Sequence, residues 1–194
     1  MKVYDPDRFQ SIVNLSMTPQ QAESRTIRLE ELSNNSSNEA LVAARELLLE
    51  YGRFVIAQPG AARFCFGSLE KEAARLPLSY REQGGGCVMA FVDNVPTGFV
   101  AWRALTPSLQ VVPDAWEMKR LWVRPFGRGL RLGKALTEAV LNRAVTAKRK
   151  AVYLDTAPAS MAAAHRMYLD MGFTPCAPYN DNPVEGLAYL VKFL

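Results

Sequence analysis

Hydrophobic positions along the chain recur at helical spacing in some segments and at strand spacing in others, which predicts a mixed α/β domain. In the first helical segment Leu41, Ala44 and Leu48 share one face, and Ser36 or Ser37 caps its start. Glycine and proline separate most of the segments. The predicted strands cover 25–30, 87–92, 98–105, 115–123, 151–156, 173–178 and 186–193, and the predicted helices cover 36–55, 68–76, 131–147 and 160–171.

The length of 194 residues and the balanced composition fit one domain with a sizeable core. We expect that domain to cover residues 25–194. Residues 1–24 are polar and irregular, with Asp5-Pro6 and Thr18-Pro19 among them, and are interpreted as an N-terminal extension.

The cysteine and histidine residues indicate where in the cell the protein is expected and whether it is expected to bind a metal. Cys65, Cys87 and Cys176 are odd in number, widely separated and form no CxxC pair, which favours a reducing cytoplasm over export. The single histidine, His165, and these scattered cysteines offer no set of metal ligands. No apolar run approaches the length of a membrane span, so no membrane partner is expected.

Charge is unevenly distributed. The net charge of the chain is +4, but residues 119–150 carry ten basic side chains and only one acidic side chain, Glu138. So positive a segment suggests an anionic partner, such as a phosphorylated ligand or a nucleic acid. Because the segment has no recognisable nucleic-acid-binding motif, nucleic acid is not expected.

Within that segment, a strand, a glycine-containing turn and a helix follow one another, as in several phosphate-binding loops. A Walker loop is excluded, since Arg128 stands where it requires glycine. A dinucleotide-binding turn matches at Gly127 and Gly129 but has Leu132 in place of its third glycine. Asp155, at the end of the next strand, keeps that alternative open, although the N-terminal half lacks the expected βαβ repeats.

The stretch RLWVRPFGRGLRLGKAL, residues 120–136, resembles the acyl-CoA-binding segment of GNAT-type N-acetyltransferases, whose pattern is [QR]-x-x-G-x-[GA]. Arg128 and Gly133 fit this pattern, while Arg131 replaces its first glycine. The later stretch LDTAPASMAAAHRMYLDMGF, residues 154–173, is similar to the family's A-x-x-[LM]-Y-x-x-x-G-F ending, with Met161 in place of a common asparagine. The resemblance implies a GNAT-like, mostly antiparallel sheet of about six to seven strands with helices on both faces.

The resemblance also implies acetyl-CoA as cosubstrate and a set of site residues. Glu117 is expected to be the base, directly or through water, and Tyr168 to donate a proton to the leaving thiolate. We expect Arg131 to have a helical φ, with its side chain reaching a CoA phosphate or solvent. The family pattern gives His165 no fixed role. The expected cofactor-binding residues are Leu121, Trp122, Val123, Arg128, Gly129, Leu130, Arg131, Leu132, Gly133, Lys134 and Tyr168.

The acceptor is less well defined. The loop PYNDNPVEG, residues 178–186, resembles that of a bacterial subgroup with EMKRL and LDT segments, and Tyr179, Asn180, Asn182 and Glu185 are candidates for the edge of an acceptor pocket. The expected reaction moves an acetyl group directly, in a ternary complex, to a primary amine; a small amine or amino acid is preferred to a protein amine. A non-catalytic acyl-CoA-binding sensor is the alternative, and a homodimer is left open.

Overall fold

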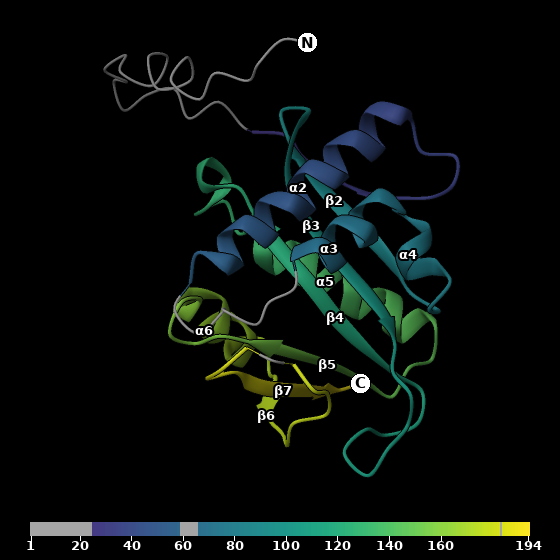
Figure 1. The fold of residues 1–194 in the computed structure, drawn as a ribbon, viewed down its shortest axis with the longest axis vertical. Helices are drawn as coiled ribbons and strands as arrows, with labels where there is room; N and C mark the ends of the chain where they lie inside the picture. Colours follow the sequence, from purple (N-terminus) through teal and green to yellow (C-terminus); the bar gives the residue numbers. More distant parts are fainter. Residues whose placement is uncertain (1–24, 59–65, 183) are drawn as a thin grey trace.

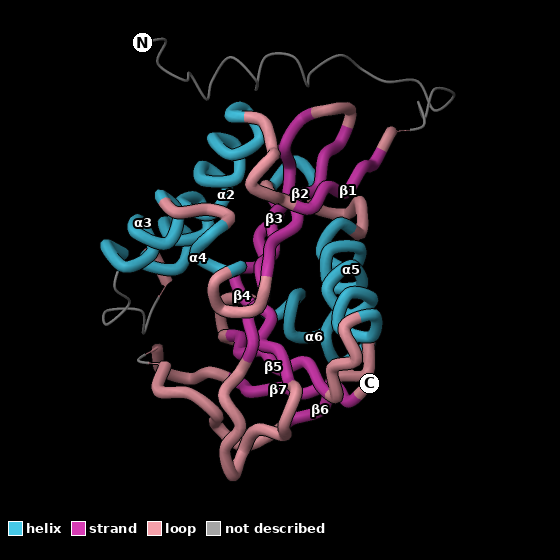
Figure 2. The backbone as a smooth tube through the Cα atoms, turned by 90° about the vertical axis from the view of Figure 1, so that its right-hand side faces the viewer, coloured by secondary structure: helices cyan, strands magenta, loops and turns pink. Residues whose placement is uncertain are grey.

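A computed structural model describes residues 25–58, 66–182 and 184–194 (Figure 1). The expected N-terminal extension, residues 1–24, and Cys65 lie outside these ranges. Within them, the described chain forms a seven-stranded sheet with helices on both faces (Figures 1 and 2). The predicted mixed α/β fold class is therefore confirmed.

The sheet has the strand order β1-β2-β3-β4-β5-β7-β6. Only β4 and β5 pair in parallel; the other five neighbouring pairs are antiparallel. β2 and β3 form the predicted hairpin, with Asp93 and Asn94 at positive φ in its turn. The strands are β1 Ile27–Glu31, β2 Gly86–Val92, β3 Val95–Ala104, β4 Ala115–Val123, β5 Ala151–Thr156, β6 Thr174–Pro175 and β7 Ala188–Phe193.

The helices lie in two layers, one on each face of the sheet (Figure 2). One layer holds α2 (Asn38–Ile56), α3 (Phe66–Ala74) and α4 (Leu78–Arg81), and the other holds α5 (Leu132–Thr146) and α6 (Ala162–Asp170). The sequence prediction missed α4, which has four residues and is too short to show helical periodicity. Among the described helices, none has the length and apolar character needed to span a bilayer.

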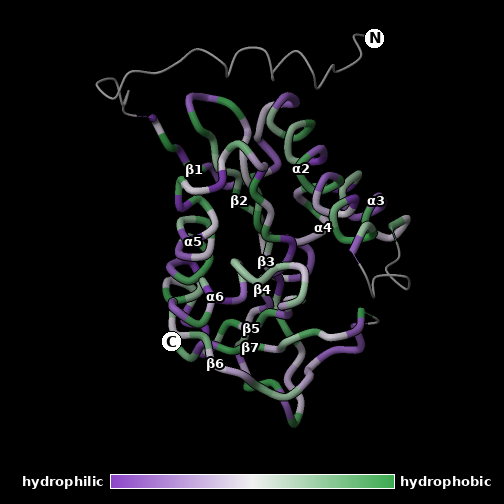
Figure 3. Tube along the Cα trace, turned by 90° about the vertical axis from the view of Figure 1, so that its left-hand side faces the viewer, coloured by the Kyte–Doolittle hydropathy of each residue, from purple (hydrophilic) through white to green (hydrophobic). Residues whose placement is uncertain are grey.

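Each layer has its own hydrophobic core against the sheet. Leu47 and Leu48 of α2 pack with Met89 and Phe99 on one face, whereas α5 packs on the other. Figure 3 shows hydrophobic and hydrophilic residues alternating along α2 and α5, as expected for helices with one buried side. Every residue of β2 is buried because it lies inside the sheet between both layers. The start of α2 is capped by Ser37, whose hydroxyl accepts from the Ala40 N–H at 3.2 Å.

The neighbouring strands β4 and β5 pair at one end only. Their parallel ladder runs from Ala115 and Ala151 to Glu117 and Tyr153, after which β4 continues to Val123 without β5 beside it. The two strands diverge from this point, as Figure 1 shows. Within the described ranges, backbone groups of residues 118–123 on that edge of β4 have no strand partner, so the opening is a place where a ligand can bind to backbone.

Candidate functional site

A β-bulge interrupts β4 beside this opening. On β3 and β4, Phe99 pairs with Trp122 and Ala101 with Lys119, so two residues of β4 oppose one residue of β3. The first of the two is Arg120, whose φ of 60° lies in the left-handed region. A bulge redirects the side chains and amides that follow it, and this bulge lies in the part of β4 that no longer pairs with β5.

The side chain of Arg120 is tied to the helical layer. Its guanidinium donates two hydrogen bonds of 3.1 Å to the Glu72 carboxylate on α3. The Tyr80 hydroxyl also donates to Glu72, and the Arg120 guanidinium lies 5.7 Å from the centre of the Tyr51 ring. Burial alone would lower the pKa of Arg120, but the surrounding Tyr51, Glu72 and Tyr80 raise it, so the guanidinium stays charged. These contacts hold the left-handed backbone in place.

Two adjacent hollows occupy the opening between β4 and β5. The first, which we call the strand hollow, is lined by residues that include Met118, Arg120, Leu154, Asp155, Tyr168 and Asn182. The second, which we call the turn groove, is lined by residues that include Trp122, Arg128, Gly129, Arg131, Gly133 and Lys134. Tyr51, Leu121, Ser160, Met161 and Ala164 line both, so the two hollows adjoin.

The turn groove lies at the start of α5. The first backbone hydrogen bond there runs from the Ala135 N–H to the Arg131 carbonyl at 3.0 Å, which leaves the N–H groups of Leu132, Gly133 and Lys134 without partners in the helix. Unpaired donors and the positive end of the helix dipole suit a phosphate. A side chain at Gly133 would meet the Met167 sulfur at 3.3 Å, so glycine keeps this surface open.

Our expectation for the backbone of Arg131 was wrong. Arg131 has φ 58° and ψ 19°, a left-handed conformation at the N-cap of α5. Gly129, two residues earlier, has φ 84°. The chain reverses here to enter the helix, and the left-handed geometry explains why a glycine would suit position 131. The Arg131 side chain is exposed and borders the turn groove.

Most of the predicted cofactor-binding residues come together. All of them except Leu130 and Tyr168 line the turn groove, and Tyr168 lines the strand hollow instead. Arg128 is exposed, with its guanidinium 5.6 Å from the centre of the Trp122 ring. These residues are suited to hold a ligand with phosphate groups. In the described ranges, no three His, Cys, Asp or Glu side chains gather in a way that could bind a metal ion.

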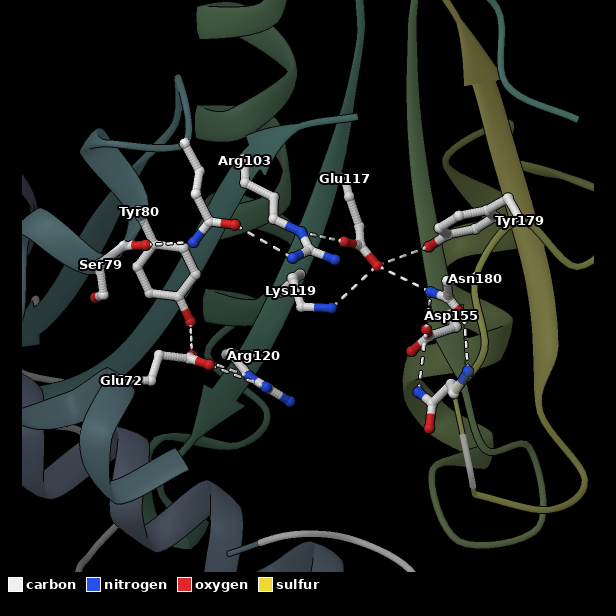
Figure 4. Close-up of polar contacts among 12 residues, drawn as sticks. Glu72, Ser79, Tyr80, Arg103, Glu117, Lys119, Arg120, Asp155, Tyr179 and Asn180 are labelled. Carbon is white, nitrogen blue, oxygen red and sulfur yellow. Dashed lines mark hydrogen bonds and ion pairs between the residues drawn. The ribbon is translucent and has the colours of Figure 1, made fainter. Parts of the chain in front are cut away.

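Glu117 is the buried centre of a polar network (Figure 4), with only 1% of its side chain exposed. It pairs with Arg103 Nε at 2.6 Å and Lys119 Nζ at 3.0 Å. It also accepts hydrogen bonds from the Tyr179 hydroxyl at 3.3 Å and the Asn180 amide at 3.1 Å. Burial alone would raise the pKa of Glu117, but the two cations outweigh burial and hold it below its usual value. Glu117 therefore stays ionised and fully engaged.

The predicted acceptor loop reaches the same network. The Asn180 and Asn182 amides both donate to Asp155 Oδ2, at 2.9 and 3.2 Å, so Asn180 bridges the carboxylates of Asp155 and Glu117 (Figure 4). Asn182 lines the strand hollow. Glu185 is exposed and lines neither hollow, so the structure does not bring it to the site.

Tyr168 projects from α6 into the strand hollow and packs edge-on against Phe173. Burial raises the pKa of Tyr168, and the nearby Tyr51 and Asp155 add to this effect. Its phenol therefore keeps its proton. His165, three residues earlier, lines neither hollow.

Several residues of the site had not been assigned to it from the sequence. Tyr51, Glu72 and Lys119 come from three elements and meet only in the folded sheet. From the sequence, Asp155 had been considered only as a residue that keeps the dinucleotide-binding alternative open. Its position at the end of a buried strand, followed by Thr156-Ala157-Pro158, was the signal that could have marked it as a site residue.

Comparison with known proteins decides the family. The family model described as Acetyltransferase (GNAT) family matches residues 41–173, which include both motif segments. The chain belongs to this family. The predicted membership of the GNAT family is thus confirmed.

Curated GNAT relatives match part of the chain. An uncharacterized N-acetyltransferase of Schizosaccharomyces pombe is 36% identical over 78 residues, which are 40% of this chain and 47% of that protein. The chain therefore spans about half the length of this curated relative. Because the relative is eukaryotic, the expected bacterial subgroup is not confirmed.

Solved structures of GNAT proteins share the fold. A GNAT acetyltransferase of Staphylococcus aureus superposes with a TM-score of 0.66 at 15% identity, over 87% of this chain and 99% of that chain. The PaiA N-acetyltransferase of Thermoplasma acidophilum, solved in complex with coenzyme A, gives a TM-score of 0.64 at 16% identity, with the same two coverages. At these identities the likeness shows the fold alone.

Proposed function

We propose that this GNAT protein transfers an acetyl group from acetyl-CoA to a primary amine, directly and in a ternary complex. The observation that carries the proposal is that the turn groove and the strand hollow adjoin at the divergence of β4 and β5. Two adjoining hollows suit a long phosphorylated cosubstrate in one and an acceptor in the other. Orientation of two bound reactants alone supplies roughly 7–11 kcal/mol of the barrier reduction.

The turn groove is proposed to hold the phosphates of CoA. The N–H groups at the start of α5 would bind the pyrophosphate, and Arg128, Arg131 and Lys134 would add charge-assisted contacts. The pantetheine arm would then run along the edge of β4 beyond Glu117, where β4 no longer pairs with β5, toward Leu121. Coenzyme A bound to the Thermoplasma acidophilum protein of the same fold supports this assignment.

In the transfer step the amine nitrogen bonds to the acetyl carbon and the carbon–sulfur bond breaks. The nitrogen loses a proton to a base, and the CoA thiolate takes one from a donor. Tyr168 is the proposed donor, since it lines the strand hollow and its raised pKa keeps it protonated until it is needed. Backbone N–H groups near Leu121 would polarise the acetyl carbonyl.

The role of Glu117 stays a prediction. As a base it would act through water, because it does not line the strand hollow. Its lowered pKa and four hydrogen-bonding partners support an anchoring role better, in which it fixes Arg103, Lys119 and the loop at Asn180. A cytoplasmic location and a homodimer also stay predictions.

A thiol-release assay with acetyl-CoA and a panel of amines tests the proposed function. We expect amine-dependent release of CoA, with the acetylated amine detected by mass spectrometry. Saturable acetyl-CoA binding by calorimetry, without turnover of any amine, would contradict the enzymatic proposal and support the acyl-CoA sensor.

A further inference from the structure

Asp155 lines the strand hollow, and among the described residues only one of its two carboxylate oxygens, Oδ2, accepts hydrogen bonds. Asp155 lies at the end of β5, beyond the last residue that pairs with β4, and lines the hollow. Its Oδ2 accepts from the amides of Asn180 and Asn182, at 2.9 and 3.2 Å. Among the described residues, no group donates to its Oδ1. The two amides therefore fix the orientation of the carboxylate while one oxygen stays available to a ligand.

Asp155 also forms no ion pair with any described residue. The other charged residues that line the strand hollow are Lys119, which pairs with Glu117 at 3.0 Å, and Arg120, which pairs with Glu72 at 3.1 Å. In the described part of the chain, no cationic side chain lies within ion-pair distance of Asp155. A partly buried carboxylate without a cationic partner favours a cationic ligand.

The lining of the strand hollow also includes aromatic and apolar side chains. Tyr51 and Tyr168 line the same hollow as Asp155, and the negative charge of Asp155 contributes, after burial, to the raised pKa of both phenols. Met118, Val184 and Leu187 line the hollow as well. Aromatic faces attract ammonium groups, and the apolar side chains suit a hydrocarbon stem.

We propose that Asp155 binds the ammonium group of the acceptor, and that the acceptor is a primary amine on an apolar or aromatic stem with no carboxylate beside the amine. This inference rests on the proposed acetyl transfer. The bound ammonium group first releases one proton to solvent, and Asp155 holds the neutral amine next to Tyr168, the proposed proton donor. The nucleophile and the leaving sulfur then lie in the same part of the hollow, and the second proton of the nitrogen goes to the base during transfer. Asn180 and Asn182 position Asp155.

The charges that line the strand hollow are the reason to propose an acceptor with no carboxylate beside its amine. The carboxylate of an α-amino acid would lie close to that of Asp155 and be repelled. Lys119 and Arg120 already have carboxylate partners, so a second carboxylate would compete with Glu117 or Glu72. An amine therefore binds better than the amino acid that carries the same side chain.

Matched substrate pairs test this inference. We measure kcat/KM for tyramine against L-tyrosine and for phenethylamine against L-phenylalanine, in the wild-type protein, Asp155→Asn and Asp181→Asn. Asp181 is an exposed aspartate in the loop between Asn180 and Asn182, and its substitution serves as the charge-matched control. We expect the wild type to prefer each amine at least about tenfold, and Asp155→Asn to lose at least about tenfold in kcat/KM for the amines. Asp181→Asn is expected to stay within about twofold of the wild type.

The outcomes separate this inference from the proposed function. Acetyl-CoA affinity, measured by calorimetry, should be unchanged in Asp155→Asn, which also shows that the variant is folded. Equal use of an amine and its amino acid by the wild type would overturn the substrate class, whatever the variant does. Amine turnover by Asp155→Asn at the wild-type rate would overturn the role of Asp155. Failure of the wild type to acetylate any amine would refute the proposed function itself.

Discussion

Arg120 at the bulge of β4 and Glu72 of α3 are joined by two hydrogen bonds of 3.1 Å each. Both side chains are 19% exposed, so the pair is largely shielded from water. Through this ion pair, α3 on one face of the sheet holds β4, the strand at which the proposed transfer takes place. The left-handed φ of Arg120 depends on this contact across the fold.

We predict that Glu72→Gln lowers both stability and activity. The substitution removes the carboxylate charge of the Glu72–Arg120 ion pair, so we expect the free energy of unfolding to fall by about 1–3 kcal/mol and kcat/KM to fall as the bulge relaxes. Urea unfolding measures the first effect. The control is Glu82→Gln, since Glu82 pairs with Arg75 at the surface, where such pairs contribute about 0–1 kcal/mol. An equal loss in both variants would show that the pair at the bulge has no special role.

For Tyr168→Phe we predict a loss in kcat of about 10²-fold with unchanged acetyl-CoA affinity. The ring and its contact with Phe173 remain, so only the hydroxyl is removed. Stopped-flow turnover and calorimetry measure the two quantities. Tyr153→Phe removes a hydroxyl bonded to the Val112 backbone, outside both hollows, and should leave kcat within about twofold. A Tyr168→Phe variant with normal kcat would exclude Tyr168 as proton donor.

Stability should depend on acid pH through Glu117. Lys119 and Arg103 outweigh burial and hold the pKa of Glu117 below 4.5, so its charged form stabilises the fold. A carboxyl group with a lowered pKa stabilises above its unfolded pKa, and this contribution is lost as pH falls through the folded pKa. We expect the free energy of unfolding to decline below about pH 4.5. In Glu117→Gln the decline should be shallower, and urea titrations whose acid slopes are identical in the two proteins would refute the assignment.

At position 131 we predict that glycine gives a more stable protein than alanine. Both substitutions remove the charge of Arg131, but only glycine adopts the left-handed φ of 58° without strain. We expect Arg131→Gly to be about 1 kcal/mol more stable than Arg131→Ala, and both to bind acetyl-CoA with a weaker salt dependence than the wild type. Thermal unfolding and calorimetry in two salt concentrations measure these effects. An alanine variant as stable as the glycine variant would mean that the left-handed backbone is not strained.

The elements that the sequence predicted well carry local signals. Ser37 caps α2, and the helix that follows the turn begins at Leu132, within one residue of its predicted start. The hairpin of β2 and β3 follows from its turn residues. Local sequence is sufficient in these places because capping and turn formation involve neighbours in the chain.

The rest of the site depends on contacts between distant residues. Arg120 lies 48 positions from Glu72, and Asp155 lies 25 positions from Asn180, so no local pattern reports either pair. The left-handed φ of Arg131 was missed for another reason: arginine rarely adopts it, and a charged side chain at the start of a helix suggests an ordinary first turn. The left-handed residues Arg120 and Arg131 both line the proposed site, where surrounding structure can hold such departures from local preference.

The central claim is direct acetyl transfer in a ternary complex at the divergence of β4 and β5. Initial rates of CoA release, measured while acetyl-CoA and an amine such as tyramine are varied together, test it most directly. We predict double-reciprocal lines that intersect, because both substrates must be bound before either product leaves. Parallel lines, which report an acetylated enzyme formed before the amine binds, would contradict the account.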